Sequence, residues 1–141
     1  MRAVFDTNVV LSGAGWRNES YRCIVAAAQR QVIVFTTPRL RDELVSQTRR
    51  IQARGEFPRD PWPVLNWWIA KTKQVLPNAV GKQRSRDPKD DEILGCGLAA
   101  RADFIVTLQV VTERSASHPV QAPTIEPKAG VAVRVTVVPL S

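Results

Sequence analysis

The chain has 141 residues and a mass of 15.7 kDa, which suits one domain and is too short for two ordinary ones. With 44% hydrophobic and 23% charged residues it can bury a core, which argues against a fully disordered protein. Its 20 basic and 13 acidic side chains give a net charge of +7, which favours an anionic partner such as nucleic acid, or a merely solvated basic surface.

The apolar runs and the cysteines indicate which cellular compartments and disulfide patterns are to be expected. No apolar run approaches the roughly 20 residues that span a bilayer, so we expect no membrane segment. The first ten residues, MRAVFDTNVV, include Asp6 within the stretch that a signal peptide would keep apolar. This excludes a signal peptide and favours a cytoplasmic location. Cys23 and Cys96 form neither a disulfide framework nor a CxxC pair, and both are expected to be buried thiols.

The basic excess is uneven along the chain. Residues 1–60 carry ten basic and six acidic side chains, and residues 61–91 carry six and three. Residues 92–141 carry four of each, so the whole excess lies in the first two-thirds of the chain.

Strand and helix patterns alternate in the first half of the chain. A strand over residues 2–5 ends on Asp6 and is followed by the turn-prone pair Thr7-Asn8. The next expected elements are a helix capped at Asn18, a buried strand at 31–36, and a helix that starts at Thr37-Pro38 and ends at Gly55.

The alternation continues to residue 107 and then stops. The expected elements are a helix from Asp60-Pro61 to about Lys73, a strand at Val75-Leu76 and a basic loop at 81–89. They are followed by a helix that starts at Asp90 or Asp91 and by a strand at 102–107. The inward residues of this last helix are expected to be Ile93, Leu94, Leu98 and Ala99. Residues 108–128 have no clean period, and 131–138 are a candidate edge strand. The pattern predicts an α/β fold with a mainly parallel sheet covered by helices on both faces.

Three carboxylates are expected at the carboxyl end of this sheet, where open parallel sheets bind ligands. Asp6 ends the first strand, Glu43 lies early in the helix after Pro38, and Asp91 opens a later helix. Carboxylates held together need a cation, and hard oxygen ligands suit Mg²⁺ or Mn²⁺. The implied chemistry is attack of metal-activated water on a phosphodiester.

Each of these acids also has a structural interpretation. Asp6 fits a turn residue that accepts a hydrogen bond from its own backbone, and Asp91 fits a helix cap. Asp42 is a rival to Glu43, and Asp87 and Asp90 are rivals to Asp91.

Other residues have alternative roles as well. Thr7 can lend its hydroxyl to the site, whereas Asn8 is expected to be structural. The only histidine, His118, precedes Pro119 in the irregular tail, which argues against a general base. Three tryptophans have the helical spacing of core residues but could also stack nucleobases: Trp62, Trp67 and Trp68.

The order and spacing of these motifs resemble PIN-domain ribonucleases over residues 1–107. The segment Asp6-Thr7-Asn8-Val9 resembles the first motif of the family, and Thr37-Pro38-x-Leu40-x-x-Glu43-Leu44 resembles the second. The third corresponds to Asp87-Pro88-Lys89-Asp90-Asp91-Glu92-Ile93-Leu94 with the following Ala102-Asp103-Phe104-Ile105-Val106-Thr107. The branch most similar to this pattern is that of the VapC-like toxins of type II toxin–antitoxin systems.

The resemblance implies a three-layer α/β/α domain and cleavage of RNA with Mg²⁺ or Mn²⁺. By motif match the ligands would be Asp6, Glu43 and Asp91, and the supporting residues would be Thr7, Asn8, Asp87, Asp90 and Thr107. Plausible phosphate contacts are Arg84, Arg86 and Lys89, although a solvated basic loop is the simpler reading. Toxin members of the family bind a small antitoxin protein and are usually homodimers.

The chain departs from the family pattern after Thr107. Where the family continues Gly-Asp-x-Asp-Leu, this chain has Leu108-Gln109-Val110-Val111, so Gln109 replaces the fourth acid of the site. A neutral amide oxygen binds a cation less well than a carboxylate, so reduced activity is expected. We hypothesise that residues 108–141, an atypical segment, come from a frameshift or a replacement.

Two function hypotheses follow from this departure: a metal-dependent endoribonuclease of reduced activity, and a non-catalytic PIN domain that binds antitoxin or RNA. A phosphatase that uses a strand-end aspartate as nucleophile is a poor third hypothesis. Such enzymes need a second aspartate two residues on, where this chain has Asn8.

Overall fold

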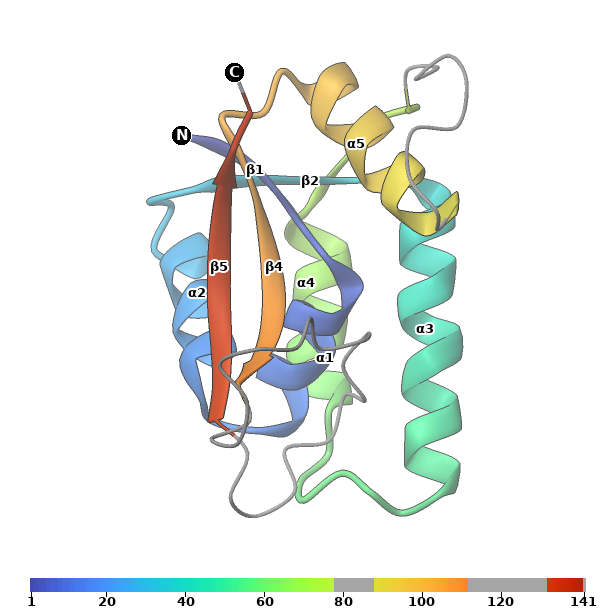
Figure 1. Cartoon of the computed structure of the whole chain (residues 1–141). Helices are drawn as coiled ribbons and strands as arrows, with labels where there is room; N and C mark the ends of the chain where they lie inside the picture. Colours follow the sequence, from blue (N-terminus) through green and yellow to red (C-terminus); the bar gives the residue numbers. More distant parts are fainter. Residues whose placement is uncertain (78–87, 112–131, 141) are drawn as a thin grey trace.

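The computed structural model of the chain describes residues 1–77, 88–111 and 132–140, which form one five-stranded sheet and five helices. The strands are β1 (Arg2–Phe5), β2 (Ile33–Thr36), β3 (Lys73–Gln74), β4 (Phe104–Val111) and β5 (Ala132–Pro139), in the spatial order β3-β2-β1-β4-β5. Every pairing among β1 to β4 is parallel, and β5 joins β4 in the antiparallel sense (Figure 1). The predicted mainly parallel sheet is therefore confirmed.

The helices are α1 (Thr7–Gly15), α2 (Glu19–Ala28), α3 (Pro38–Ala53), α4 (Trp62–Lys71) and α5 (Pro88–Ala100). Two of the predicted starts are confirmed in detail. The side chain of Asn18 accepts from the backbone N–H groups of Ser20 and Tyr21, and Thr37 caps α3 by accepting from the N–H of Leu40. Gly55 follows α3 with φ +69°, a left-handed conformation that favours glycine.

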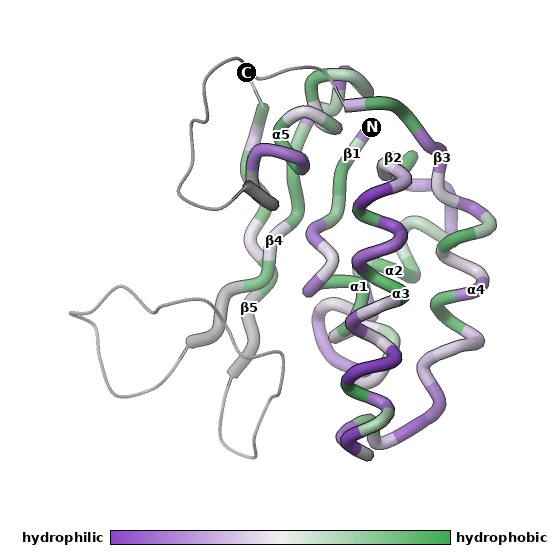
Figure 2. Tube along the Cα trace, turned by 90° about the vertical axis from the view of Figure 1, so that its right-hand side faces the viewer, coloured by the Kyte–Doolittle hydropathy of each residue, from purple (hydrophilic) through white to green (hydrophobic). Residues whose placement is uncertain are grey.

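The sheet lies between two helical layers, because alternate residues of each strand point to opposite faces. On one face Phe5, Val34 and Val106 pack with residues of α1 to α4. On the other face Val4, Phe35 and Ile105 pack mainly with α5. Figure 2 shows α5 on one side of the strands and the other four helices on the opposite side. The three-layer α/β/α fold is confirmed.

The strand β4 extends well past its parallel neighbour. Phe104 to Val106 pair with β1, whereas the residues from Thr107 to Val111 continue in register with β5. Leu108 in this extension is nearly buried in the same core as α1. The chain after Thr107 therefore continues the sheet as a long hairpin strand instead of becoming irregular at once, as its sequence suggested. The candidate edge strand at 131–138 corresponds to β5, one residue later.

Three local expectations were wrong. The turn expected at Thr7-Asn8 is the first turn of α1, because Asp6 supplies a helix cap. The third strand is Lys73–Gln74, two residues before the expected Val75-Leu76, and is fixed by its pairing with β2.

The last of the three concerns α5, which starts at Pro88 and not at Asp90 or Asp91, since proline at the start of a helix loses no needed donor. Its inner face includes Ile93, Cys96 and Ala100, all buried, whereas Leu98 is 51% exposed. No helix within the described ranges is long and apolar enough to cross a membrane.

Candidate functional site

The carboxyl end of the sheet is where three helices begin. Asp6 directly follows β1, and its backbone N–H donates to the carbonyl of Val106 on β4 at 2.9 Å. Thr37 directly follows β2, the strand on the other side of β1. The starts of α1 and α3 therefore lie side by side at one end of the sheet, as the sequence predicted.

Asp6 is held in place as the cap of α1. Its backbone is extended, with φ −60° and ψ 142°, and its Oδ1 accepts from the backbone N–H of Asn8 at 3.3 Å. The buried hydroxyl of Thr7 also donates to this oxygen, at 3.4 Å. The structural interpretation of Asp6 is confirmed, and its carboxylate is fixed at the strand end that the site prediction requires.

A contact that the sequence did not predict joins α5 to the same end of the sheet. The hydroxyl of Thr37, fully buried, donates to Glu92 Oε1 at 2.8 Å across 55 positions of sequence. The same oxygen of Thr37 accepts from Leu40 N–H, so both of its hydrogen-bonding roles are used. Glu92 belongs to the acidic segment Asp90-Asp91-Glu92, but no local pattern indicates that Thr37 is its partner.

Glu43 lies in the second turn of α3 and is partly buried. Its Oε1 accepts from the side-chain amide of Gln47 at 3.0 Å, and the Oε1 atom of Gln47 is buried without a hydrogen-bond partner among the described residues. The rival Asp42 has a side chain 77% exposed, 3.8 Å from Arg41. Glu43 is therefore the better placed of the two for a site within the protein.

The remaining predicted residues divide between the described and the undescribed parts of the chain. Asp91 is the fourth residue of α5, partly buried and next to Glu92. Thr107 lies across β1 from Thr37, and its hydroxyl donates to the carbonyl of Thr136 at 3.4 Å. Five predicted residues lie outside the described part, either entirely or in their side chains, and remain predictions. They are Arg84, Arg86 and Asp87 entirely, and Lys89 and Asp90 in their side chains. His118 also lies outside the described part.

Gln109 lies within a strand that the sequence pattern predicted to end at Thr107. Gln109 lies inside β4, opposite Arg134 of β5, three residues beyond the last pairing of β4 with β1. The chain at this point continues as a strand, and the neutral Gln109 stands where the family pattern has its fourth acid.

The predicted ligands for a divalent cation are all carboxylates. Carboxylates are the ligands that Mg²⁺ and Mn²⁺ prefer, and Asp6, Glu43 and Asp91 come from elements that meet at one end of the sheet. Within residues 1–77, 88–111 and 132–140, however, no three Asp, Glu, His or Cys side chains are grouped closely enough to hold a metal ion. The residues fit a metal in chemical type, and the assignment of the ligands stays a prediction.

The three tryptophans of α4 have different environments. Trp68 is buried against Phe5, with ring centroids 5.0 Å apart, and belongs to the core. The indole N–H of Trp62 donates to Gln52 Oε1 at 2.8 Å. Trp67 is partly buried and lines a pocket at the amino end of β2. The core interpretation is confirmed for Trp68, whereas Trp62 and Trp67 are both partly buried and pack against the same core.

The comparison with protein families agrees with this geometry. The sequence matches the PIN domain family over residues 2–110, which is most of the chain and ends just before the last residue of β4. No curated protein and no solved structure matches the chain significantly. PIN domains are generally nucleases, and they typically use divalent metal ions. Since the match covers far more than half of its length, the chain belongs to the PIN domain family.

Proposed function

We propose that the protein is a metal-dependent endoribonuclease whose site lies at the carboxyl end of the sheet, with Asp6, Glu43 and Asp91 as metal ligands. The observation that carries this proposal is the position of Asp6, fixed by Val106 and by the first turn of α1 where helices α1 and α3 begin. Mg²⁺ or Mn²⁺ bound there would activate water and stabilise negative charge on the scissile phosphate.

Residues around the proposed site orient the carboxylate of Asp6 and provide a positive electrostatic potential. Thr7 and the N–H of Asn8 hold one oxygen of Asp6, which leaves the direction of the carboxylate little freedom. The N-termini of α1 and α3 carry partial positive charge, which favours both carboxylates and a phosphate nearby. The hydrogen bond between Thr37 and Glu92 fixes the first turns of α5 against the start of α3.

RNA is the proposed substrate, and charge supports this choice. The whole net excess of basic residues lies in residues 1–91, which carry 16 basic and nine acidic side chains. Lys and Arg bind the nucleic acid backbone through its phosphates. Arg84, Arg86 and Lys89 are the proposed contacts close to Asp91 in sequence.

An RNA cleavage assay with three variants tests the proposal. The wild type should cut RNA only with Mg²⁺ or Mn²⁺, Asp6→Asn should lose that activity, and Gln109→Asp should raise it. Asp103→Asn is the matched control, because Asp103 lies at the opposite end of the sheet, where its Oδ2 accepts from the N–H of Arg2. Equal cutting by wild type and Asp6→Asn would refute the assigned site.

A non-catalytic binding module is the second candidate. It is favoured by the absence of a ready group of three ligands among the described residues and by the neutral residue at position 109. In this case the wild type and Asp6→Asn would both be inactive, and both would bind RNA or an antitoxin with equal affinity.

The cellular role that we propose is that of a cytoplasmic toxin held inactive by a small antitoxin protein, and acting as a homodimer. The similarity of the motifs to VapC-like toxins supports this role. Induced expression of the wild type should arrest growth, Asp6→Asn should not, and a small protein encoded directly upstream should restore growth. Sedimentation of the purified chain measures the oligomeric state, and a monomer at micromolar concentration would refute the dimer.

A further inference from the structure

A second feature lies at the amino end of the sheet, away from the acidic site. A pocket of about 550 Å³ opens between the C-terminal ends of α2 and α4, beside the first residues of β2. Three cationic residues line it: Arg30, Lys71 and Lys73. No Asp or Glu is among the described residues that line it, so this basic pocket has one sign of charge.

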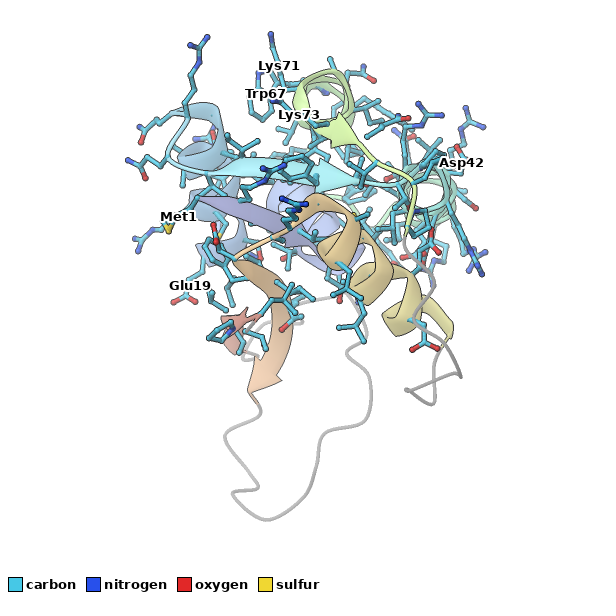
Figure 3. All side chains as sticks on the ribbon, turned by 90° about the horizontal axis from the view of Figure 1, so that it is seen from above. Met1, Glu19, Asp42, Trp67, Lys71 and Lys73 are labelled. Atoms are coloured by element: carbon cyan, nitrogen blue, oxygen red, sulfur yellow. The ribbon has the colours of Figure 1, made fainter. Side chains whose placement is uncertain are left out.

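The wall of the basic pocket combines the cations with a flat ring. Trp67 lines it from α4, and the apolar side chains of Val32 and Ile33 line it from the strand side. Figure 3 shows Trp67, Lys71 and Lys73 next to one another beside β2, with Asp42 on the far side of the molecule. The volume lies within the range of pockets that bind small ligands.

We propose that the basic pocket binds one nucleotide of a single-stranded RNA, with the base against Trp67 and its phosphates against Lys71, Lys73 and Arg30. Any base can stack on an aromatic side chain, and cations beside the ring match the adjoining phosphates. An apolar ligand would leave the cations without a partner, and a simple inorganic anion would not use the ring. The inference rests on the proposed RNA substrate but not on the Asp6 site, since it concerns binding at the other end of the sheet.

Arg30 has a backbone conformation that is uncommon for a residue with a side chain. Arg30 has φ +60°, a left-handed conformation in which glycine is the usual residue after a helix. Arg30 is one of the residues that line the basic pocket. Arg101 has φ +50° after α5 and does not line the pocket, so it is a matched control.

A structural explanation competes with this proposal. Lys71 lies in the last turn of α4, where a cation is favoured by the helix dipole. If the cations served only the helix ends, their removal would lower the melting temperature and leave RNA affinity unchanged. The test therefore measures both quantities.

Binding of a labelled twelve-nucleotide oligouridine to the full chain, in EDTA to prevent cleavage, tests the proposal. The double variant Lys71→Gln, Lys73→Gln should weaken binding at low salt and make the dependence of log K on log salt shallower by about 1. Arg49→Gln with Arg50→Gln removes the same charge from exposed positions of α3 outside the pocket and should have a smaller effect. Trp67→Leu should weaken binding about tenfold, and Trp67→Phe should keep most of the affinity.

Competitors identify the ligand, and glycine variants separate binding from stability. Arg30→Gly should weaken RNA binding without lowering the melting temperature, whereas Arg101→Gly should leave binding unchanged. Polyglutamate should not displace the RNA; displacement that depends on Trp67 would overturn the assignment in favour of an acidic peptide. Adenosine monophosphate that binds through Trp67, with no binding of the oligonucleotide, would overturn the assignment to an RNA strand. Unchanged affinity in the lysine and tryptophan variants would overturn the proposal altogether.

Discussion

The two ends of the central sheet differ in charge and in the kind of backbone that meets there. At the carboxyl end helices start, and four acidic residues lie at their caps or in their first two turns: Asp6, Glu43, Asp91 and Glu92. At the amino end of β2 and β3, helices α2 and α4 finish, and the residues around them carry Arg30, Lys71 and Lys73. One sheet thus separates the acidic residues of the proposed metal site from the cations of the proposed nucleotide pocket, so the two proposals can be tested independently.

The largest expected effect is on catalysis at the carboxyl end. Glu43→Gln should lower the rate of metal-dependent RNA cleavage by at least about 100-fold, because it removes a charged ligand from the proposed site. Asp42→Asn, one residue earlier and exposed, should change the rate by less than about twofold because its side chain is solvated. Equal losses in the two variants would show that overall charge matters and not this site.

The next effect concerns the contact that joins α3 to α5. Thr37→Val should lower the free energy of unfolding by about 2 kcal/mol, because it removes the cap of α3 and leaves Glu92 without its donor. Thr37→Ser keeps the hydroxyl and should lose much less. Urea denaturation measures both variants, and equal losses would mean that the hydroxyl is not what stabilises this end.

The charge of Glu92 also affects the pKa of Cys96, which lies one turn further along α5. Burial, with a smaller contribution from Glu92, raises the pKa of Cys96 from 9.0 to about 12. A raised pKa means that the folded state favours the neutral thiol, so this stability is complete below pH 9 and is lost as the pH rises towards 12. The stability of the wild type relative to Cys96→Ala should therefore fall over this range in urea titrations. A difference that stays constant with pH would contradict the raised pKa.

Reactivity gives a second measurement of the same group. Because the thiolate is the reactive form, Cys96 should react far more slowly with iodoacetamide at pH 8 than a free thiol does. Cys23, only partly buried, should react first in the native protein. Mass spectrometry measures the rate of labelling at each cysteine. Labelling of Cys96 at the same rate as Cys23 would contradict the burial of Cys96.

The smallest effect is expected at the amino end. Arg30→Gly and Arg101→Gly each relieve a left-handed residue and remove a cation from a helix C-terminus, so the free energy of unfolding should change by no more than about 1 kcal/mol. Thermal melts of the pair measure this change. A large loss of stability in Arg30→Gly alone would mean that the Arg30 side chain stabilises the fold and does not serve mainly to bind a ligand.

Local signals in the sequence predicted the elements that depend on neighbouring residues. The cap at Asn18, the start at Thr37-Pro38 and the end at Gly55 follow from backbone groups that adjacent side chains satisfy. Asp6 was placed correctly at the end of a strand, which is a local pattern, whereas the helix α1 that it caps was expected to be a turn.

Features set by distant residues could not be predicted in the same way. The strand β3 has only two residues, and its position depends on pairing with Phe35 and Thr36 and not on its own apolar pattern, which favoured Val75-Leu76. The bond from Thr37 to Glu92 joins residues 55 positions apart. The basic pocket is lined by residues from two distant segments, 27–34 and 67–73, so only the fold could reveal it.

Manganese binding to the full chain tests most directly whether the metal site lies at the carboxyl end of the sheet and not at the amino end. The electron paramagnetic resonance signal of the free ion measures this binding. The wild type and Lys71→Gln, Lys73→Gln should bind Mn²⁺ with the same affinity, and Asp6→Asn should bind it at least about tenfold more weakly. Equal binding by the wild type and Asp6→Asn would show that the carboxyl end of the sheet is not the metal site.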